Sequence, residues 1–260
     1  MTILDQLADH ARKRVSEAKK RIPAEAMKRQ ALSLPKGGFA FENALKKSDI
    51  AFICECKKAS PSKGLIAPDF PYLEIAGEYE AAGADCISVL TEPKWFSGSD
   101  EYLKEIAAAV RIPCLRKDFT VDEYMIYEAK ALGASAVLLI CSILTEEEIR
   151  DSIRLCDELG LSALVEAHDG AEVRAAVNAG ARMIGVNNRN LRDFTVDTDN
   201  SRRLRELIPK DVLFISESGV RCAQDVAKLR EIGADAVLIG ETLMRAADKR
   251  AKLAELRGGV

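Results

Sequence analysis

A short apolar run preceded by glycine and alanine occurs four times along the chain, about fifty residues apart. The four copies are GADCISVL (83–90), GASAVLLI (133–140), GARMIGVN (180–187) and GADAVLIG (233–240). A period of this length indicates that one supersecondary unit recurs along the chain. Each copy has the β-branched, apolar composition of a buried parallel strand, and its glycine suits the end of a preceding helix.

Another apolar run lies before the first copy and between successive copies. These runs are AFICECK (51–57), IPCLRK (112–117), LSALVEA (161–167) and VLFISES (212–218). Helical patterns separate the runs, and Thr145 with Glu148 forms a capping box at the start of one helix. Eight β/α units in about 200 residues predict a (β/α)₈ barrel, the TIM-barrel fold. A doubly wound open sheet is the alternative, but no GxGxxG follows the first strand.

We find no linker in the 260 residues and predict a single barrel domain over residues 1–260. Residues 1–49 form an N-terminal helical extension, 50–247 the eight β/α units and 248–260 a C-terminal helical tail. Apolar residues on one helical face predict that the extension packs on the barrel, and these are Leu4, Leu7, Ala8, Ala11 and Val15. Thr2 with Asp5 predicts a capping box at its start.

The composition argues against several classes of protein. A formal net charge of −3 does not suit a general nucleic-acid binder. The first fifteen residues lack the apolar segment of a secretory signal, and the longest apolar run, 136–141, is too short to span a bilayer. Seven cysteines, mostly inside apolar runs, indicate free thiols in a cytoplasmic protein rather than disulfides. We expect no metal site, because the Cys54–Cys56 pair lacks neighbouring ligands.

Charged side chains stand at the C-terminal ends of several predicted strands, where barrels carry their active sites. Because side chains alternate along a strand, Glu55 and Lys57 share one face, and we expect that face to point to the barrel axis. The same parity directs Lys117, Glu166 and Glu217 to the axis. Each residue alone would fit a solvated loop or a structural ion pair, but five charges at one mouth favour catalysis.

Two glycine-containing loops follow the seventh and eighth strands, with Ser218–Gly219 in one and Gly240–Glu241 in the other. In barrels these loops often bind phosphate through backbone N–H groups. Tight turns alone would also explain the glycines, but their place favours phosphate binding. Trp95 and Phe96 lie in the loop after the second strand, either as a lid on the barrel or as an apolar wall for an aromatic substrate.

In their order along the chain, these motifs resemble the indole-3-glycerol phosphate synthase family. The motifs are ECKKASPSKG, LTEPKWFSGS, LRKDF, LVEAH, IGVNNRNL, ISESG and LIGETLM. The resemblance covers essentially the whole chain and implies a carboxy-lyase of tryptophan biosynthesis that uses no cofactor and no metal. Such an enzyme decarboxylates, cyclises and dehydrates 1-(2-carboxyphenylamino)-1-deoxyribulose 5-phosphate, which gives indole-3-glycerol phosphate, CO₂ and water.

The resemblance also implies residue roles. Lys117 matches the family's principal general acid, and Glu166 matches the carboxylate that handles protons and stabilises a cationic intermediate. Glu55 and Lys57 match an ion pair that places Lys57 beside the substrate. The other matches bind the substrate. Asn187 and Glu217 hold the anilino-sugar, and Arg189 meets either its carboxylate or the loops around it. Phe96, Phe119 and Leu238 line the pocket for the aromatic ring, and Ser60, Ser218, Gly219, Gly240 and Glu241 line the substrate and phosphate sites. Many relatives carry serine at Glu241, so only its backbone N–H carries over.

The stretch ECKKASPSKG is then predicted to supply strand residues to the site and a mobile loop that closes over it. The rivals are another phosphosugar barrel such as phosphoribosylanthranilate isomerase, a Schiff-base aldolase with Lys57 or Lys117 as nucleophile, and a non-catalytic barrel. We expect a small phosphorylated anilino-sugar as ligand, no nucleic acid and no membrane. We also expect a monomer, and association with other enzymes of the pathway is left open.

Overall fold

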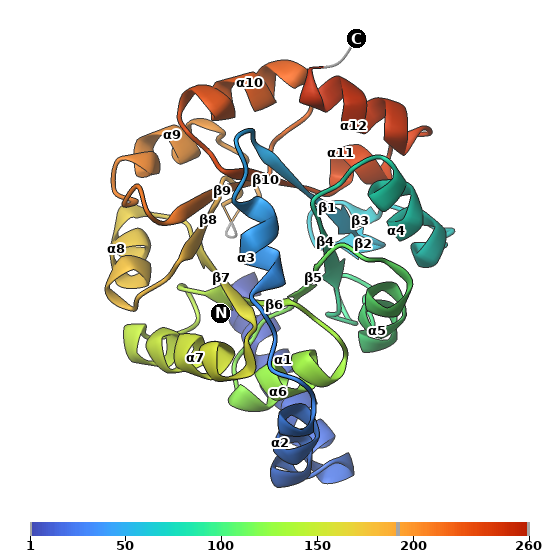
Figure 1. The fold of residues 1–260 in the computed structure, drawn as a ribbon, viewed down its shortest axis with the longest axis vertical. Helices are drawn as coiled ribbons and strands as arrows, with labels where there is room; N and C mark the ends of the chain where they lie inside the picture. The colour runs from blue at the N-terminus through green and yellow to red at the C-terminus, as the bar shows by residue number, and fades with distance from the viewer. Residues whose placement is uncertain (1, 191–192, 259–260) are drawn as a thin grey trace.

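The structure, a computed structural model, describes residues 2–190 and 193–258, and its parallel strands close into a barrel (Figure 1). The barrel strands are β1 (Ala51–Cys56), β4 (Cys86–Leu90), β5 (Cys114–Lys117), β6 (Ala136–Ile140), β7 (Ser162–Ala167), β8 (Met183–Asn187), β9 (Leu213–Glu217) and β10 (Ala236–Ile239). Strand β1 pairs with both β4 and β10, which closes the sheet. Every barrel strand falls within one of the eight predicted runs. The predicted (β/α)₈ fold is therefore confirmed, and the open-sheet alternative is wrong.

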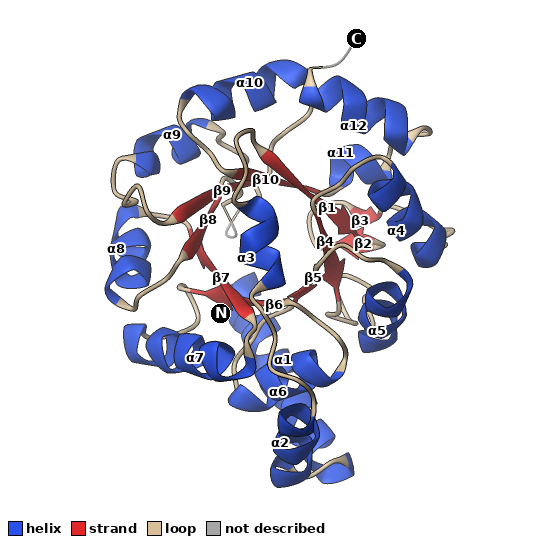
Figure 2. Ribbon diagram, viewed as in Figure 1, coloured by secondary structure: helices blue, strands red, loops and turns tan. Residues whose placement is uncertain are grey.

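Helices form a ring outside the strands (Figure 2). They are α4 (Tyr72–Ala81), α5 (Asp100–Ala109), α6 (Glu123–Ala131), α7 (Glu146–Leu159), α8 (Gly170–Asn178), α9 (Asp199–Arg205), α10 (Ala223–Glu231) and α12 (Lys249–Arg257), with the short α11 (Glu241–Met244) directly after β10. Helix α12 lies between α10 and α4 (Figure 1). Its Leu253 and Leu256 are buried. Residues that the sequence analysis placed in a C-terminal tail thus complete the ring, and the single-domain assignment stays a prediction.

Local sequence signals set the ends of α7. The hydroxyl of Thr145 accepts the backbone N–H of Glu148, and the Glu148 carboxylate accepts the backbone N–H of Thr145, so the predicted capping box is confirmed. The helix ends at Gly160, whose φ of 69° is left-handed and favours glycine. A Cβ on Gly160 would also overlap the backbone of Gly37, where the N-terminal extension crosses the end of α7.

Helix α1 (Ile3–Arg21) covers the C-terminal mouth of the barrel, and its predicted capping box of Thr2 and Asp5 is present. The predicted apolar face is buried, with Leu4, Leu7, Ala8, Ala11 and Val15 as its members. Arg14 donates from Nη2 to Oδ1 of the buried Asp118, 2.6 Å away and directly after β5. This ion pair fixes α1 over the mouth.

The opposite, N-terminal mouth is closed by α3 (Ala40–Leu45), while α2 (Ala24–Ser33) lies beside α6 (Figure 1). Phe41 and Leu45 are buried in the apolar cluster inside the barrel. The backbone N–H of Glu42 donates to the hydroxyl of Ser162 at the start of β7. Because α3 closes this end, a ligand must enter at the C-terminal mouth.

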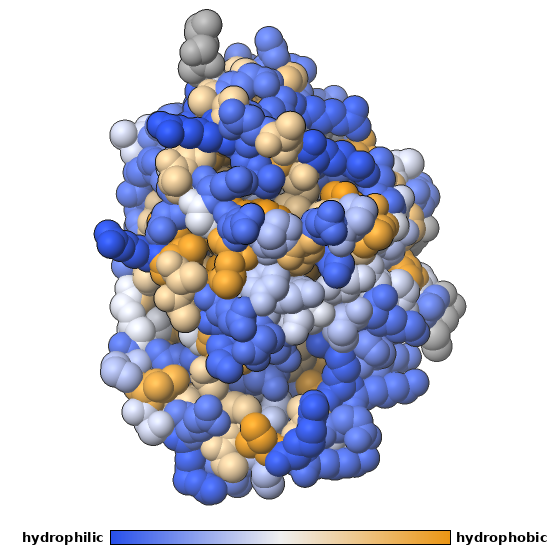
Figure 3. Space-filling view, turned by 90° about the vertical axis from the view of Figure 1, so that its right-hand side faces the viewer, coloured by the Kyte–Doolittle hydropathy of each residue, from blue (hydrophilic) through white to orange (hydrophobic). Residues whose placement is uncertain are grey.

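The parity predicted for β1 holds in the core. Cys54 and Cys56 lie in the apolar layer between strands and helices, whereas Ile53 lies in the cluster inside the barrel. The outer surface seen in Figure 3 is mostly hydrophilic, with apolar side chains in small groups. Within residues 2–190 and 193–258, no helix combines the length and apolarity needed to cross a membrane.

Candidate active site

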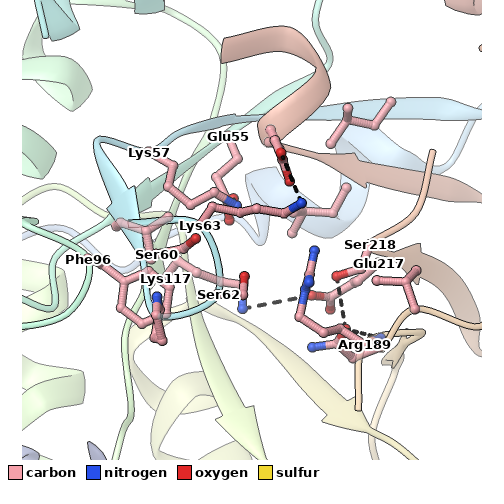
Figure 4. Close-up of a pocket in the computed structure, with 18 of the residues that line it drawn as sticks. Glu55, Lys57, Ser60, Ser62, Lys63, Phe96, Lys117, Arg189, Glu217 and Ser218 are labelled. Atoms are coloured by element: carbon pink, nitrogen blue, oxygen red, sulfur yellow. Dashed lines mark hydrogen bonds and ion pairs between the residues drawn. The ribbon is translucent and has the colours of Figure 1, made fainter. Parts of the chain in front are cut away.

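A cavity of about 760 Å³ lies at the C-terminal mouth of the barrel. The structure brings every predicted site residue to its lining: Glu55, Lys57, Ser60, Phe96, Lys117, Phe119, Glu166, Asn187, Arg189, Glu217, Ser218, Gly219, Leu238, Gly240 and Glu241. Figure 4 draws 18 of the lining residues and labels ten, which reach the cavity from strands and loops far apart in the sequence. The alternation of side chains along parallel strands accounts for this convergence.

Lys117 lies between two buried carboxylates at the centre of the cavity. Its Nζ donates to Glu166 Oε2 at 3.1 Å and lies 3.8 Å from Glu217 Oε2. Burial opposes the charge on Lys117, but the carboxylates of Glu166, Glu217 and Glu55 raise its pKa above the ordinary value. The amine is therefore an ammonium at neutral pH and a proton donor.

The two carboxylates beside Lys117 differ in protonation. Burial favours the neutral acid of Glu166, but Lys117 first and His168 next outweigh it and lower the pKa of Glu166 to about 2. Burial and the neighbouring Glu166 charge raise the pKa of Glu217 to about 8. At neutral pH Glu166 is thus ionised and Glu217 protonated. Two neighbouring carboxyl groups with separated pKa values suit acid–base chemistry.

The raised pKa of Glu217 predicts how stability depends on pH. The native state holds a proton on Glu217 that the unfolded chain loses near the ordinary carboxyl pKa of about 4.3. Between that pH and about 8, native Glu217 binds more protons than unfolded Glu217, so its contribution lowers the free energy of unfolding as pH rises. In urea unfolding between pH 5 and pH 8, we expect the free energy of unfolding to fall more steeply with pH in wild type than in Glu217→Gln. Parallel pH curves would contradict the assignment.

The Glu55–Lys57 pair is held at 2.5 Å, from Lys57 Nζ to Glu55 Oε1. Gly240 makes room for it, because a Cβ there would overlap the Glu55 carboxylate and lie 2.8 Å from Lys57 Nζ. Gly185 on β8 makes room for the Glu217 carboxylate in the same way. The sequence analysis related Gly240 only to phosphate and gave Gly185 no role. For Gly185, a glycine inside a barrel strand is the signal that it could have used.

We expect Gly240→Ala to lower kcat/KM by about tenfold to a hundredfold while the melting temperature changes little. The backbone of Gly240 has φ −113°, which alanine tolerates, and the groups that must move are the flexible ends of Glu55 and Lys57. The matched control is Gly77→Ala at an exposed position of α4, where a Cβ meets nothing within 4 Å. Unchanged kinetics in Gly240→Ala would show that the position of the pair is not critical.

The two predicted phosphate loops lie on one side of the cavity. Ser218 has a φ of 68° and Gly219 a φ of 101°, so this turn is left-handed, and the Ser218 hydroxyl donates to Asn187 Oδ1 at 3.0 Å. The Glu241 carboxylate pairs with Arg245 at 3.1 Å and with Lys63 at 3.7 Å. Glu241 is thus compensated by two cations that themselves line the cavity.

The two aromatic residues in the loop after β4, Trp95 and Phe96, have different surroundings. Phe96 faces the cavity, with its ring 6.1 Å from that of Phe119, whereas Trp95 packs edge-on against His10 of α1 at 5.3 Å. Phe96 therefore forms a wall and Trp95 packs on the protein itself. The buried Glu92 orders this loop by accepting the backbone N–H groups of residues 94–96, a role that the sequence analysis missed.

The stretch ECKKASPSKG continues from β1 into a hairpin of β2 (Ala59–Ser60) and β3 (Gly64–Leu65). Gly64 has a φ of 62°, as the turn requires. Lys63 extends from this hairpin across the cavity toward α11 (Figure 4), where it meets Glu241. The hairpin thus borders the cavity, and its predicted closing motion stays a prediction.

The fold and the cavity define a TIM-barrel enzyme whose candidate site combines paired lysines and carboxylates with an aromatic wall. Residues 4–256 match the family model described as indole-3-glycerol phosphate synthase. The chain is 58% identical over 257 residues to the indole-3-glycerol phosphate synthase of Ruminiclostridium cellulolyticum, covering 98% of this chain and 99% of the relative. It is 48% identical over 267 residues to that of Lachnoclostridium phytofermentans, covering 98% of each.

The chain belongs to the indole-3-glycerol phosphate synthase family of carboxy-lyases, which acts in tryptophan biosynthesis. The resemblance drawn from the sequence motifs is therefore confirmed. Among solved structures, 3-hexulose-6-phosphate synthase from Salmonella typhimurium aligns with a TM-score of 0.67 at 17% identity, covering 80% of this chain and 97% of that one. At this identity the alignment supports the fold alone.

Proposed function

We propose that the cavity converts 1-(2-carboxyphenylamino)-1-deoxyribulose 5-phosphate into indole-3-glycerol phosphate with Lys117 as the general acid. The observation that carries the proposal is the buried Lys117 ammonium between Glu166 and Glu217, in a cavity that Phe96 and Phe119 border. The aromatic carbon that bears the carboxylate attacks the ketose carbonyl only if the carbonyl oxygen is protonated or strongly polarised. Lys117 supplies that proton.

The later steps use the carboxylates. Ring closure leaves positive charge on the anilino ring system, which the ionised Glu166 stabilises until CO₂ departs and the ring regains its aromaticity. Dehydration then protonates the new hydroxyl, expels it as water and removes a proton from the adjacent carbon. The Glu55–Lys57 pair borders the same cavity and shares this proton transfer.

The substrate's ends fit the two sides of the cavity. We assign the aromatic ring to the wall of Phe96, Phe119 and Leu238, and its carboxylate to Arg189. We assign the phosphate to the loops at Ser218–Gly219 and Gly240–Glu241, whose backbone N–H groups suit an anion. Asn187 and Glu217 hold the sugar between them, and Ser60 borders it from the β2–β3 hairpin. The monomeric state, any association with other enzymes of the pathway and the cytoplasmic location stay predictions.

The test is an assay with this substrate that follows the fluorescence of the indole product. A second readout is the proton balance: the substrate carboxylate leaves as neutral CO₂ and the ketose oxygen as water, so each turnover takes up one proton. A pH indicator in weak buffer should report one proton taken up per product in the first seconds, before the released CO₂ hydrates to bicarbonate and returns a proton. An isomerase would take up none. A lysine adduct trapped by borohydride with the same substrate would contradict the proposal and favour a Schiff-base aldolase.

A further inference from the structure

His168 stands directly after β7 and beside the carboxylate to which the proposed mechanism gives proton handling. Its Nε2 lies 3.4 Å from Glu166 Oε1, while Glu166 Oε2 faces Lys117. Nε2 is buried and makes no hydrogen bond within the described residues. A lone pair at Nε2 facing an ionised carboxylate would be repelled. A proton on Nε2 instead turns the contact into an attraction between opposite charges.

The other side of the imidazole ring is held from α8 and from the loop after β6. Nδ1 lies 3.1 Å from Glu172 Oε2, which also accepts the backbone N–H of His168 at 2.7 Å. The hydroxyl of Ser142 donates to the second oxygen of Glu172 at 2.5 Å and lies 3.3 Å from Nδ1. Glu172 therefore fixes Nδ1–H as a donor and sets the orientation of the ring.

Carboxylates from three elements face His168: Glu166 on β7, Glu172 on α8 and, at longer range, Glu217 on β9. Asp169 is the next residue, but its carboxylate caps α8 by accepting the backbone N–H groups of Ala171 and Glu172. Burial opposes the charge on the imidazole, but Glu172 and Glu166 outweigh it and raise the pKa of His168 above its ordinary value. Geometry and charge thus both favour the protonated form of this imidazole between two carboxylates.

We propose that His168 is a positioning residue that, held by Glu172, keeps the Glu166 carboxylate turned toward Lys117. The proposal rests on the proposed function of Glu166. It also explains the final residue of the LVEAH motif, to which the mechanism gives no other task. The competing explanation is purely structural: the bonds to Glu172 would do no more than fasten the end of β7 to the first turn of α8.

A matched pair of substitutions separates the two explanations. The side-chain amide of asparagine reaches the position of Nδ1, so His168→Asn retains the bond to Glu172 and loses the group that faces Glu166. Glutamine reaches the position of Nε2, so His168→Gln retains a neutral donor toward Glu166. We expect His168→Asn to lower kcat about tenfold to a hundredfold with little change in KM, and His168→Gln to lose less. A structural role predicts the reverse order.

The pH dependence of kcat gives the second readout. Loss of the imidazolium raises the pKa of Glu166. The acidic limb of the kcat–pH profile, where kcat falls as pH decreases, should therefore move to higher pH, by about one pH unit in His168→Asn. Glu172→Gln should move the limb in the same direction by less, because the imidazole is then less readily protonated. In a Glu166→Gln background, His168→Asn should move the limb no further, since its effect passes through Glu166. Glu147→Gln, at an exposed position in the first turn of α7, is the control.

A third readout does not need turnover. The chain has only two histidines, so His10→Gln leaves one imidazole, and nitrogen-15 NMR then reports the protonation of His168 directly. We expect it to titrate above the ordinary histidine pKa of about 6.5, and at a lower pH once Glu166→Gln is added. Either of two results overturns the proposal: a His168→Asn enzyme with an unmoved acidic limb and kcat within twofold of wild type, or an imidazole that does not titrate above the ordinary histidine pKa. If His168→Asn does not fold, Glu172→Gln and the NMR titration decide. A wild-type enzyme that makes no indole product contradicts the proposed function instead, and the titration still tests His168.

Discussion

Lys117→Ala is expected to lower kcat by at least about a thousandfold, the largest effect of any single substitution in the cavity. Within the described structure, Lys117 is the one lysine within ion-pair distance of Glu166 and Glu217. Without it, carbonyl protonation and carbon–carbon bond formation lose their proton source. Steady-state kinetics on the anilino-sugar phosphate, with single-turnover kinetics for the chemical step, measure the loss.

The fold should survive this substitution. Glu217 holds a proton near neutral pH, and the loss of Lys117 allows Glu166 to take up a proton more readily, so no pair of unpaired buried charges remains. Circular dichroism and the melting temperature check this. Lys104→Ala on the exposed face of α5 is the control for loss of a lysine. Lys117→Arg keeps the charge, but a guanidinium does not release its proton, so it should remain nearly inactive.

Two outcomes would change the role of Lys117. A Lys117→Ala enzyme with kcat within tenfold of wild type would remove the residue from the chemistry. A Lys117→Arg enzyme with near-normal kcat would reduce its role to electrostatic stabilisation, because a fixed charge would then suffice.

The sequence predicted the barrel and the charged strand residues of the cavity for a simple reason. In a parallel barrel the C-terminal ends of all strands meet at one mouth, and alternation decides which side chains face inward. Glu55, Lys117, Glu166 and Glu217 each stand at such an inward position, so their convergence needs no knowledge of distances. The same rule places Cys54 and Cys56 outside the barrel.

The contacts that the sequence did not predict depend on which atoms lie next to each other across strands and loops. Gly240 adjoins the Glu55–Lys57 pair because β1 and β10 pair with Cys54 opposite Ile239. This register is set by the packing of the whole barrel, and no local pattern encodes it. The role of Glu92 likewise depends on a loop that folds back on a buried carboxylate.

Glu166→Gln is the second large effect, and we expect kcat to fall by about a hundredfold to a thousandfold with KM changed by no more than about threefold. Glutamine keeps the shape and size of the side chain but cannot accept a proton or stabilise a cation as a carboxylate does. Because the proposed function assigns substrate binding mainly to the phosphate loops and the aromatic wall, the loss should fall on the chemical step.

The substitution should also change the neighbouring groups in a defined direction. Burial and the charge of Glu166 raise the pKa of Glu217, so removal of that charge should lower the Glu217 pKa from about 8. The residual activity of Glu166→Gln should therefore show its Glu217-dependent pH transition at lower pH than wild type. Glu147→Gln again serves as the control for loss of a carboxylate. A variant with normal kcat and a raised KM would limit Glu166 to substrate binding, and the proposed task of His168 would then fail with it.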